Sequence, residues 1–258
     1  MIITVTNSRS QSVTFTGDQT KYQVTSVTGL DPGKAQINTT KIIGVDGSRF
    51  NSASLNNRNI VINFKCMSSA IRRDLYQKFP LKEKVSVSVS TDITATIEGC
   101  VDAFSCDLFG KNEMMQLSIL CDDPFFHGAN WTGSHDWYDG EPEDVVLMNN
   151  GDAETGIFLQ IQVGGDVSSL DHIEVDYGTN YVRVNYPGAV AGGIFRIDTA
   201  EKSVTYQAPG SRPGSILSYL DSGSEFFKIA PGQQTISVDV DAQYVSMSMI
   251  VPTRLGGM

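Results

Sequence analysis

Residues 114–126, Met-Met-Gln-Leu-Ser-Ile-Leu-Cys-Asp-Asp-Pro-Phe-Phe, combine an alternating stretch with an acidic corner. Apolar residues at every second position of the first part predict a β-strand with one buried face. Pro124 has no backbone N–H and favours an extended conformation at Asp123, so strand pairing should end there. Phe125 and Phe126 then place two large rings where the chain leaves the sheet. They predict either a lid on the core or a contact with another molecule.

This corner separates two halves that differ in charge. Residues 1–126 carry 13 Lys and Arg against 12 Asp and Glu, whereas residues 127–258 carry 6 against 17. The formal net charge of −10 is therefore concentrated in the second half. Neutralising nucleic-acid phosphates or an anionic membrane surface needs clustered Lys and Arg. The distribution argues against both kinds of partner.

The length of 258 residues allows two ordinary domains, each with its own core. We predict a first domain at 1–126, a linker at 127–139 that lacks periodicity and holds both tryptophans, and a second domain at 140–258. The sequence starts without the layout of a signal peptide, and no apolar run approaches the roughly 18 residues that a membrane helix needs. The protein should therefore stay in the cytoplasm after synthesis.

The first domain is predicted to be mainly β. Residues 85–90 alternate Val with Ser, which indicates a strand with one buried and one wet face. Together with 94–104 and 114–121, which a turn at 109–112 joins, this strand predicts a three-stranded antiparallel unit. Further strands are predicted at 22–27, 36–43 and 59–66, and a polar, exposed loop is predicted at 50–58.

One helix is predicted in the whole sequence, at 69–79. Ile71, Leu75 and Phe79 fall four residues apart and therefore lie on one face. A preceding serine can cap the helix, and Pro80 ends it. We expect the three apolar side chains to dock the helix on the first domain.

The second half is predicted to be an antiparallel β-sandwich. Short runs rich in Val, Ile and Tyr are separated by Gly and Pro turns, and no helical pattern interrupts them. The predicted strands are 145–148, 157–163, 173–177, 181–186, 194–197, 204–206, 235–240 and 244–251.

No pattern predicts a catalytic residue, a cofactor or a metal. The three histidines are scattered, and Asp122 and Asp123 turn to opposite sides of an extended backbone, which disfavours an acid–base pair. The four cysteines lack a CxxC pair, so we expect reduced and mostly buried thiols, with a four-cysteine zinc site as the less favoured alternative. Trp131, Trp137 and Tyr138 could stack on a sugar ring, although aromatics tucked against a domain face are commoner.

The order of these features resembles the distal tail protein family of long-tailed phages. The resemblance covers nearly the whole sequence and is weaker after residue 127. Family members carry an aromatic residue where this sequence has Cys100. The matching stretches are Tyr22–Val27 with Gly29, Leu30 and Pro32, then Asp46-Gly47, Arg73–Tyr76, Ile97–Val101, Leu117–Phe126, Asn149–Asp152 and Ile229–Ile236.

The resemblance implies a structural virion protein of the tail tip, made in the bacterial host cytoplasm, and not an enzyme. The first domain would be a β-barrel with one helix that assembles as a hexameric ring, the belt that joins the tail tube to baseplate or fibre proteins. The second domain would be a galectin-like or carbohydrate-binding-module-like sandwich that projects outward. The residues expected to support assembly or structure are Ile71, Leu75, Phe79, Asp123, Pro124, Phe125 and Phe126.

Two other functions remain open. One is a sugar-binding module that recognises a cell-surface glycan of the host, for which Tyr177, Tyr181 and Tyr186 lie near one predicted hairpin. The other is a glycoside hydrolase, which the absence of a paired-carboxylate framework disfavours.

Overall fold

The structure is a computed structural model and describes residues 1–17, 21–66, 68–107, 114–137, 141–164, 170, 172–242 and 244–258. The chain divides into two compact units. The first unit is Met1–Gly128 together with Leu255–Met258, and the second is Ala129–Arg254. The chain therefore passes between the units twice, and each unit is described below by itself. The turn predicted at 109–112 lies outside the described residues.

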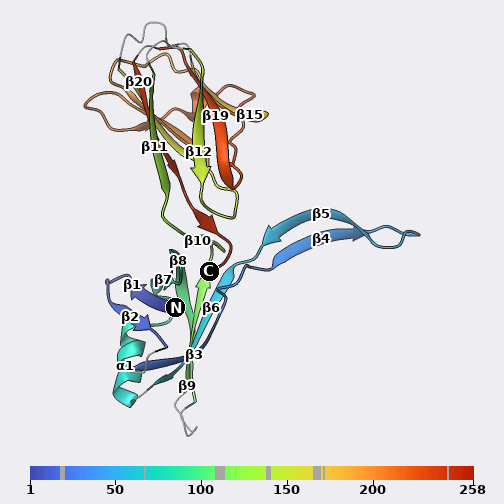
Figure 1. The fold of residues 1–258 in the computed structure, drawn as a ribbon, viewed down its shortest axis with the longest axis vertical. Coiled ribbons are helices and arrows are strands. Elements are labelled where there is room, and N and C mark those ends of the chain that lie inside the picture. Colours follow the sequence, from blue (N-terminus) through green and yellow to red (C-terminus); the bar gives the residue numbers. More distant parts are fainter. Residues whose placement is uncertain are drawn as a thin grey trace. The chain divides into compact units, whose positions relative to one another are not determined.

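The first unit is built on one large antiparallel sheet (Figure 1). The predicted unit of 85–90, 94–104 and 114–121 is confirmed as three neighbouring strands, with the valines of 85–89 buried. Two short strands, β10 (Phe126–His127) and β21 (Arg254–Leu255), lie off the main path. The main path runs β2 (Ser12–Phe15), β1 (Ile2–Asn7), β7 (Lys84–Ser90), β8 (Thr94–Cys106), β9 (Met114–Cys121), β6 (Arg58–Cys66) and β3 (Tyr22–Thr28).

This sheet curls until its two outermost strands approach each other. The rings of Phe15 on β2 and Tyr22 on β3 have centroids 5.4 Å apart, and Phe64 on β6 lies 5.0 Å from Phe15. Among the described residues, a single bridge between Thr16 and Gln23 joins β2 to β3. The sheet is thus strongly curved, but a continuous hydrogen-bonded ladder does not close it into the barrel that the resemblance implied.

A two-stranded hairpin extends from the sheet of the first unit (Figure 1). It consists of β4 (Ala35–Lys41) and β5 (Ser48–Leu55), which pair only with each other within the described residues. We call residues 35–55 the arm. The exposed loop predicted at 50–58 is wrong, because β5 occupies most of it and Arg58 begins β6. The strand gave no alternating signal because neither of its faces is buried.

The single predicted helix is confirmed as α1 (Ser69–Lys78). The Ser68 hydroxyl accepts a hydrogen bond from the backbone N–H of Ile71 at 3.3 Å, which caps the first turn. Lys78 and Asp74, one helical turn apart, form an ion pair of 2.8 Å.

The second unit consists of two antiparallel sheets that share one apolar core. The predicted strands are confirmed, and a short 3₁₀ helix η1 (Leu217–Tyr219) lies between the strands predicted at 204–206 and 235–240. One sheet runs β11 (Trp131–Trp137), β20 (Val245–Val251), β13 (Phe158–Val163), β16 (Ile194–Asp198), β17 (Ser203–Gln207) and β18 (Gly214–Ser215). The other runs β12 (Glu143–Asn149), β19 (Gly232–Val240), β14 (Ile173–Tyr177) and β15 (Asn180–Val184).

The boundaries of the units differ from the predicted domain boundaries at both ends. The stretch 127–139 contains β11, which pairs with β20 along its whole length, so it is not an irregular linker. The sequence did not reveal β11, because its described side chains at 131–136 are not buried and its Gly-Ser-His-Asp segment shows no hydrophobic alternation. Residues 255–258 belong to the first unit, although the sequence placed them in the second domain.

Candidate assembly surface

The predicted stripe on α1 faces inward. Leu75 and Phe79 have no exposed side-chain surface, and the half-buried Ile71 packs against the same core. The three residues therefore hold the helix on the first unit and leave the opposite helix face for other contacts.

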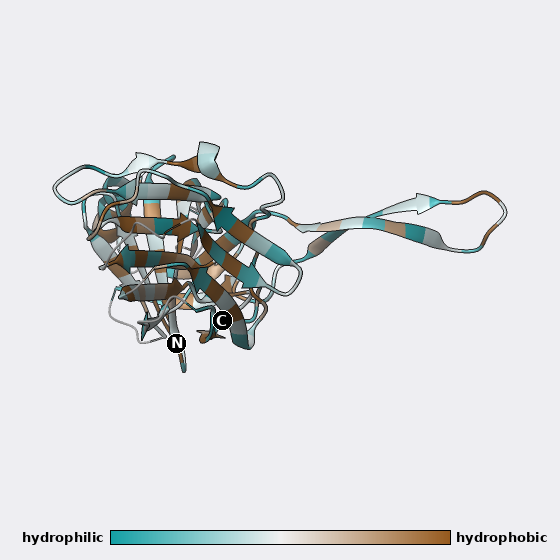
Figure 2. Ribbon diagram, turned by 90° about the horizontal axis from the view of Figure 1, so that it is seen from above, coloured by the Kyte–Doolittle hydropathy of each residue, from teal (hydrophilic) through white to brown (hydrophobic). Residues whose placement is uncertain are grey.

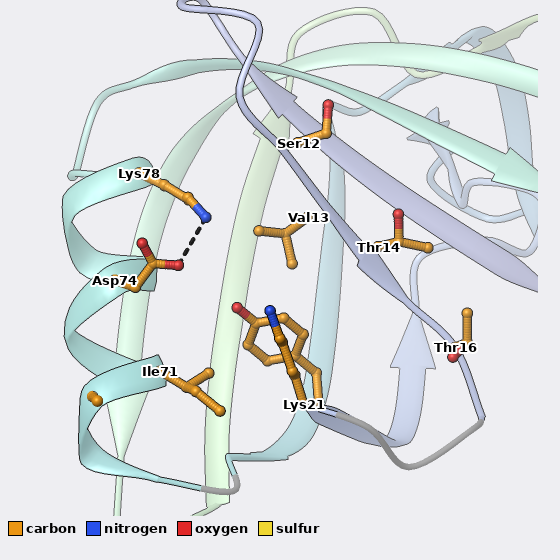
Figure 3. Close-up of a pocket in the computed structure, with 10 residues that line it drawn as sticks. Ser12, Val13, Thr14, Thr16, Lys21, Ile71, Asp74 and Lys78 are labelled. Atoms are coloured by element: carbon orange, nitrogen blue, oxygen red, sulfur yellow. Dashed lines mark hydrogen bonds and ion pairs between the residues drawn. The ribbon is translucent and has the colours of Figure 1, made fainter.

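A groove of about 440 Å³ lies between α1 and β2 (Figure 3). Lys78 and Asp74 of the helix lie across it from the hydroxyls of β2, and Lys21 extends over its floor. Tyr22 lines the groove as well, and burial followed by the nearby Asp74 carboxylate raises the pKa of its hydroxyl to about 12. The described residues that line the groove carry hydroxyl, ammonium, carboxylate and apolar side chains.

The acidic corner is stabilised by its own side chains. The Asp123 carboxylate accepts a hydrogen bond from the Phe125 backbone N–H through Oδ1 at 3.1 Å. Its Oδ2 lies 3.1 Å from Nε2 of His127, whereas Asp122 is exposed. Asp123 therefore shapes the turn, in keeping with the turn chemistry of aspartate.

The end of the corner is fixed by a buried arginine. Phe126 is fully buried, and the Arg58 guanidinium lies 4.8 Å from the centre of its ring. Arg58 also donates from Nε to the Pro124 carbonyl at 2.6 Å. Phe126 is thus a lid on the core, and Phe125 beside it is half-buried.

Sequence reasoning missed Arg58, although a signal was present. In β6 the buried positions are Arg58, Ile60, Ile62, Phe64 and Cys66, so the arginine stands in phase with the apolar face. A charged residue on the buried phase of a strand is uncommon unless it is paired or hydrogen-bonded.

Several strongly exposed apolar side chains of the first unit lie on the arm. Ile43 is fully exposed, and Ile37, Val45 and Phe50 each expose about three-fifths of their side chains. Figure 2 shows the hydrophobic colouring around the turn of the arm. The strands on either side are exposed at every position. Isolated two-stranded hairpins are marginally stable in water, so this exposure suits a segment that another protein surface covers.

The four cysteines form no disulfide, and two of them are buried. Burial raises the pKa of the Cys121 thiol to about 11, against the lowering effect of nearby Arg58. Because the thiolate is the reactive form, we expect iodoacetamide at pH 8 to modify the half-buried Cys100 and Cys106 while Cys121 stays unmodified. Peptide mass mapping before and after unfolding in urea measures this difference. Labelling of folded Cys121 as fast as of Cys100 would contradict it.

The aromatic residues considered for sugar stacking pack mainly on their own unit. Trp131, Tyr177 and Tyr186 are partly buried against the core of the second unit. The Tyr181 hydroxyl donates to the Asp221 carboxylate at 3.0 Å. The Trp137 side chain and Tyr138 lie outside the described residues.

Two further searches concern only the described ranges. No three His, Cys, Asp or Glu side chains there come together in a way that could hold a metal ion. No helix there is long and apolar enough to cross a membrane.

Known proteins show the same organisation. Residues 150–249 match the family described as siphovirus-type tail component, C-terminal domain. The fold is similar to that of SPP1 Dit (gp 19.1), described as a paradigm of the hub adsorption apparatus in phages that infect Gram-positive bacteria, with 16% identity and a TM-score of 0.74 over 97% of this chain and 98% of that one. Residues 150–249 are thus similar to a siphovirus tail component, and the fold of the whole chain is similar to that of SPP1 Dit. Both findings agree with the resemblance found in the sequence.

Other comparisons are weaker. The phage P2 baseplate in its activated conformation with Ca gives 10% identity and a TM-score of 0.44, over 98% of this chain and 97% of that one. No curated protein matches the sequence.

Proposed function

We propose that this chain is a distal tail protein of the phage tail tip, that it forms a closed homohexameric ring that joins the tail tube to baseplate or fibre proteins, and that it has no enzymatic activity. The first unit forms the ring, with its curled sheet as a barrel-like body. The second unit is a galectin-like sandwich. The observation that supports ring formation most strongly is the exposed apolar arm.

In a closed ring, each copy binds its two neighbours through two different surfaces that are complementary to each other. The arm provides one of these surfaces, because it extends beyond the sheet of its own unit and carries exposed apolar side chains. The complementary surface, which binds the arm, lies on the body of the next copy. Residues 1–126 carry a formal charge of +1, so neighbouring bodies can approach without strong mutual repulsion.

The test is the mass of the full chain in solution. Light scattering and native mass spectrometry should give six times the chain mass of 28.0 kDa, and negative-stain images should show rings. Measurements over a range of protein and salt concentrations separate a specific ring from weak association. A monomer at every concentration would contradict the proposal, and a closed ring of another size would contradict only the number six.

A further inference from the structure

The arm joins the sheet at two short connections, which we call the arm root. Residues 29–34 lead from β3 into β4, and residues 56–57 lead from β5 into β6. Every residue of both arm strands is exposed. Packing along the arm therefore does not fix its direction, and the contacts at the root must do so.

Arg58, the first residue after the root, binds the opposite root connection. Its Nη1 donates to the carbonyls of Gly29 and Asp31, both at 2.7 Å. Nε donates to Pro124 at 2.6 Å, and Nη2 donates to Gly256. Only 6% of the Arg58 surface is exposed. The planar guanidinium can hold several carbonyls at once in a fixed geometry, which the single ammonium of lysine cannot do.

Residues 256–258 hold the same root connection. The Met258 N–H donates to the Leu30 carbonyl at 2.9 Å. Gly257 lies so close to Pro32 that an added Cβ would be 2.9 Å from the Pro32 nitrogen and 2.8 Å from its Cδ. The half-buried Met258 packs against the core of the first unit.

The root connection at residues 29–34 also passes close to the start of β6. Gly29 has a φ of +87°, and a Cβ there would lie 2.1 Å from the Asn59 carbonyl oxygen. The backbone at Gly29 therefore passes directly against the start of β6. Contacts from Arg58, from Asn59 and from residues 256–258 together surround residues 29–32.

We propose that Arg58 and residues 256–258 form a clasp that sets the direction of the arm, with Arg58 as the positioning residue. This inference rests on the proposed ring, in which the arm reaches the next copy. A clasped arm is already oriented before association, so less conformational freedom is lost when the ring closes. Breaking the clasp should weaken assembly without removing any residue of the arm.

The first test uses the full chain with Arg58→Met, which keeps the length of the side chain and removes its N–H donors. Arg73→Met on the exposed face of α1 is the matched control. Hydrogen exchange should become faster at residues 29–34 while the strands β7 to β9 keep their protection. The concentration for half-assembly should rise at least about tenfold, and Arg58→Lys should restore little of it. Root amides that exchange as in the wild type, or exchange that rises equally across the sheet, would overturn the proposal.

The second test breaks the clasp from its other side and leaves Arg58 in place. Gly257→Val should give the same two changes, because its side chain must displace Pro32. Gly214→Val is the control, since no atom lies within 4 Å of a Cβ at that position. Wild-type exchange and assembly in Gly257→Val would overturn the clasp. If the wild-type chain itself fails to assemble, the ring proposal fails, while the exchange measurement still decides whether Arg58 holds the root.

Discussion

Ile43→Asp combined with Phe50→Asp should leave the full chain monomeric at concentrations where the wild type forms rings. Both side chains are on the arm and largely exposed, so the substitutions should leave the fold of the unit intact. In the ring each would be buried, which is worth about 1.5–3 kcal/mol per large apolar side chain. Since about 1.4 kcal/mol corresponds to a factor of ten, the dissociation constant should rise at least about a hundredfold.

Light scattering across a dilution series measures this effect. Val190→Asp provides the control, because Val190 is also an exposed apolar residue but lies in the second unit. The Val190→Asp variant should form rings as the wild type does. Rings of unchanged stability in the arm variant would show that the assembly surface lies elsewhere on the chain.

Leu75→Ala should lower the free energy of unfolding of the first unit by about 2–5 kcal/mol, as buried leucine truncations do. Leu75 has no exposed surface and lies at the centre of the stripe that holds α1. The alanine leaves a cavity that the surrounding strands can fill only partly. Urea denaturation of the full chain, monitored with a probe in the first unit, measures the change in the free energy of unfolding.

Gln77→Ala on the exposed face of the same helix is the control. It alters helix propensity only slightly, so its effect should stay within about 0.5 kcal/mol. If Leu75→Ala and Gln77→Ala unfolded at the same urea concentration, the apolar stripe would have to contribute nothing to docking. The burial of the leucine makes the opposite result the expected one.

The sequence allowed prediction of the elements that have one buried face. The spacing of Ile71, Leu75 and Phe79 revealed α1, and the Val–Ser alternation of 85–90 revealed β7. The same logic could not reveal β5, because both its faces are exposed, or β11, whose sequence alternates weakly. Hydrophobic periodicity arises from burial, so a strand without a buried face shows no alternating pattern and is not detected from it.

The site was predicted less completely than the fold. Asp123, Pro124, Phe125 and Phe126 were predicted to support assembly or structure, and the hydrogen bonds of Asp123 and Pro124 and the burial of Phe126 lie within the first unit. Arg58 was missed because its partners are carbonyls brought together from distant parts of the chain. The role of these residues in assembly stays a prediction.

The chain connects its two units at two places, after Gly128 and after Arg254. Arg58 grips the backbone near both of them, at Pro124 and at Gly256. The same side chain also holds the carbonyls of Gly29 and Asp31 at the base of the arm, so a single guanidinium links the arm to the backbone beside both points at which the chain leaves the first unit.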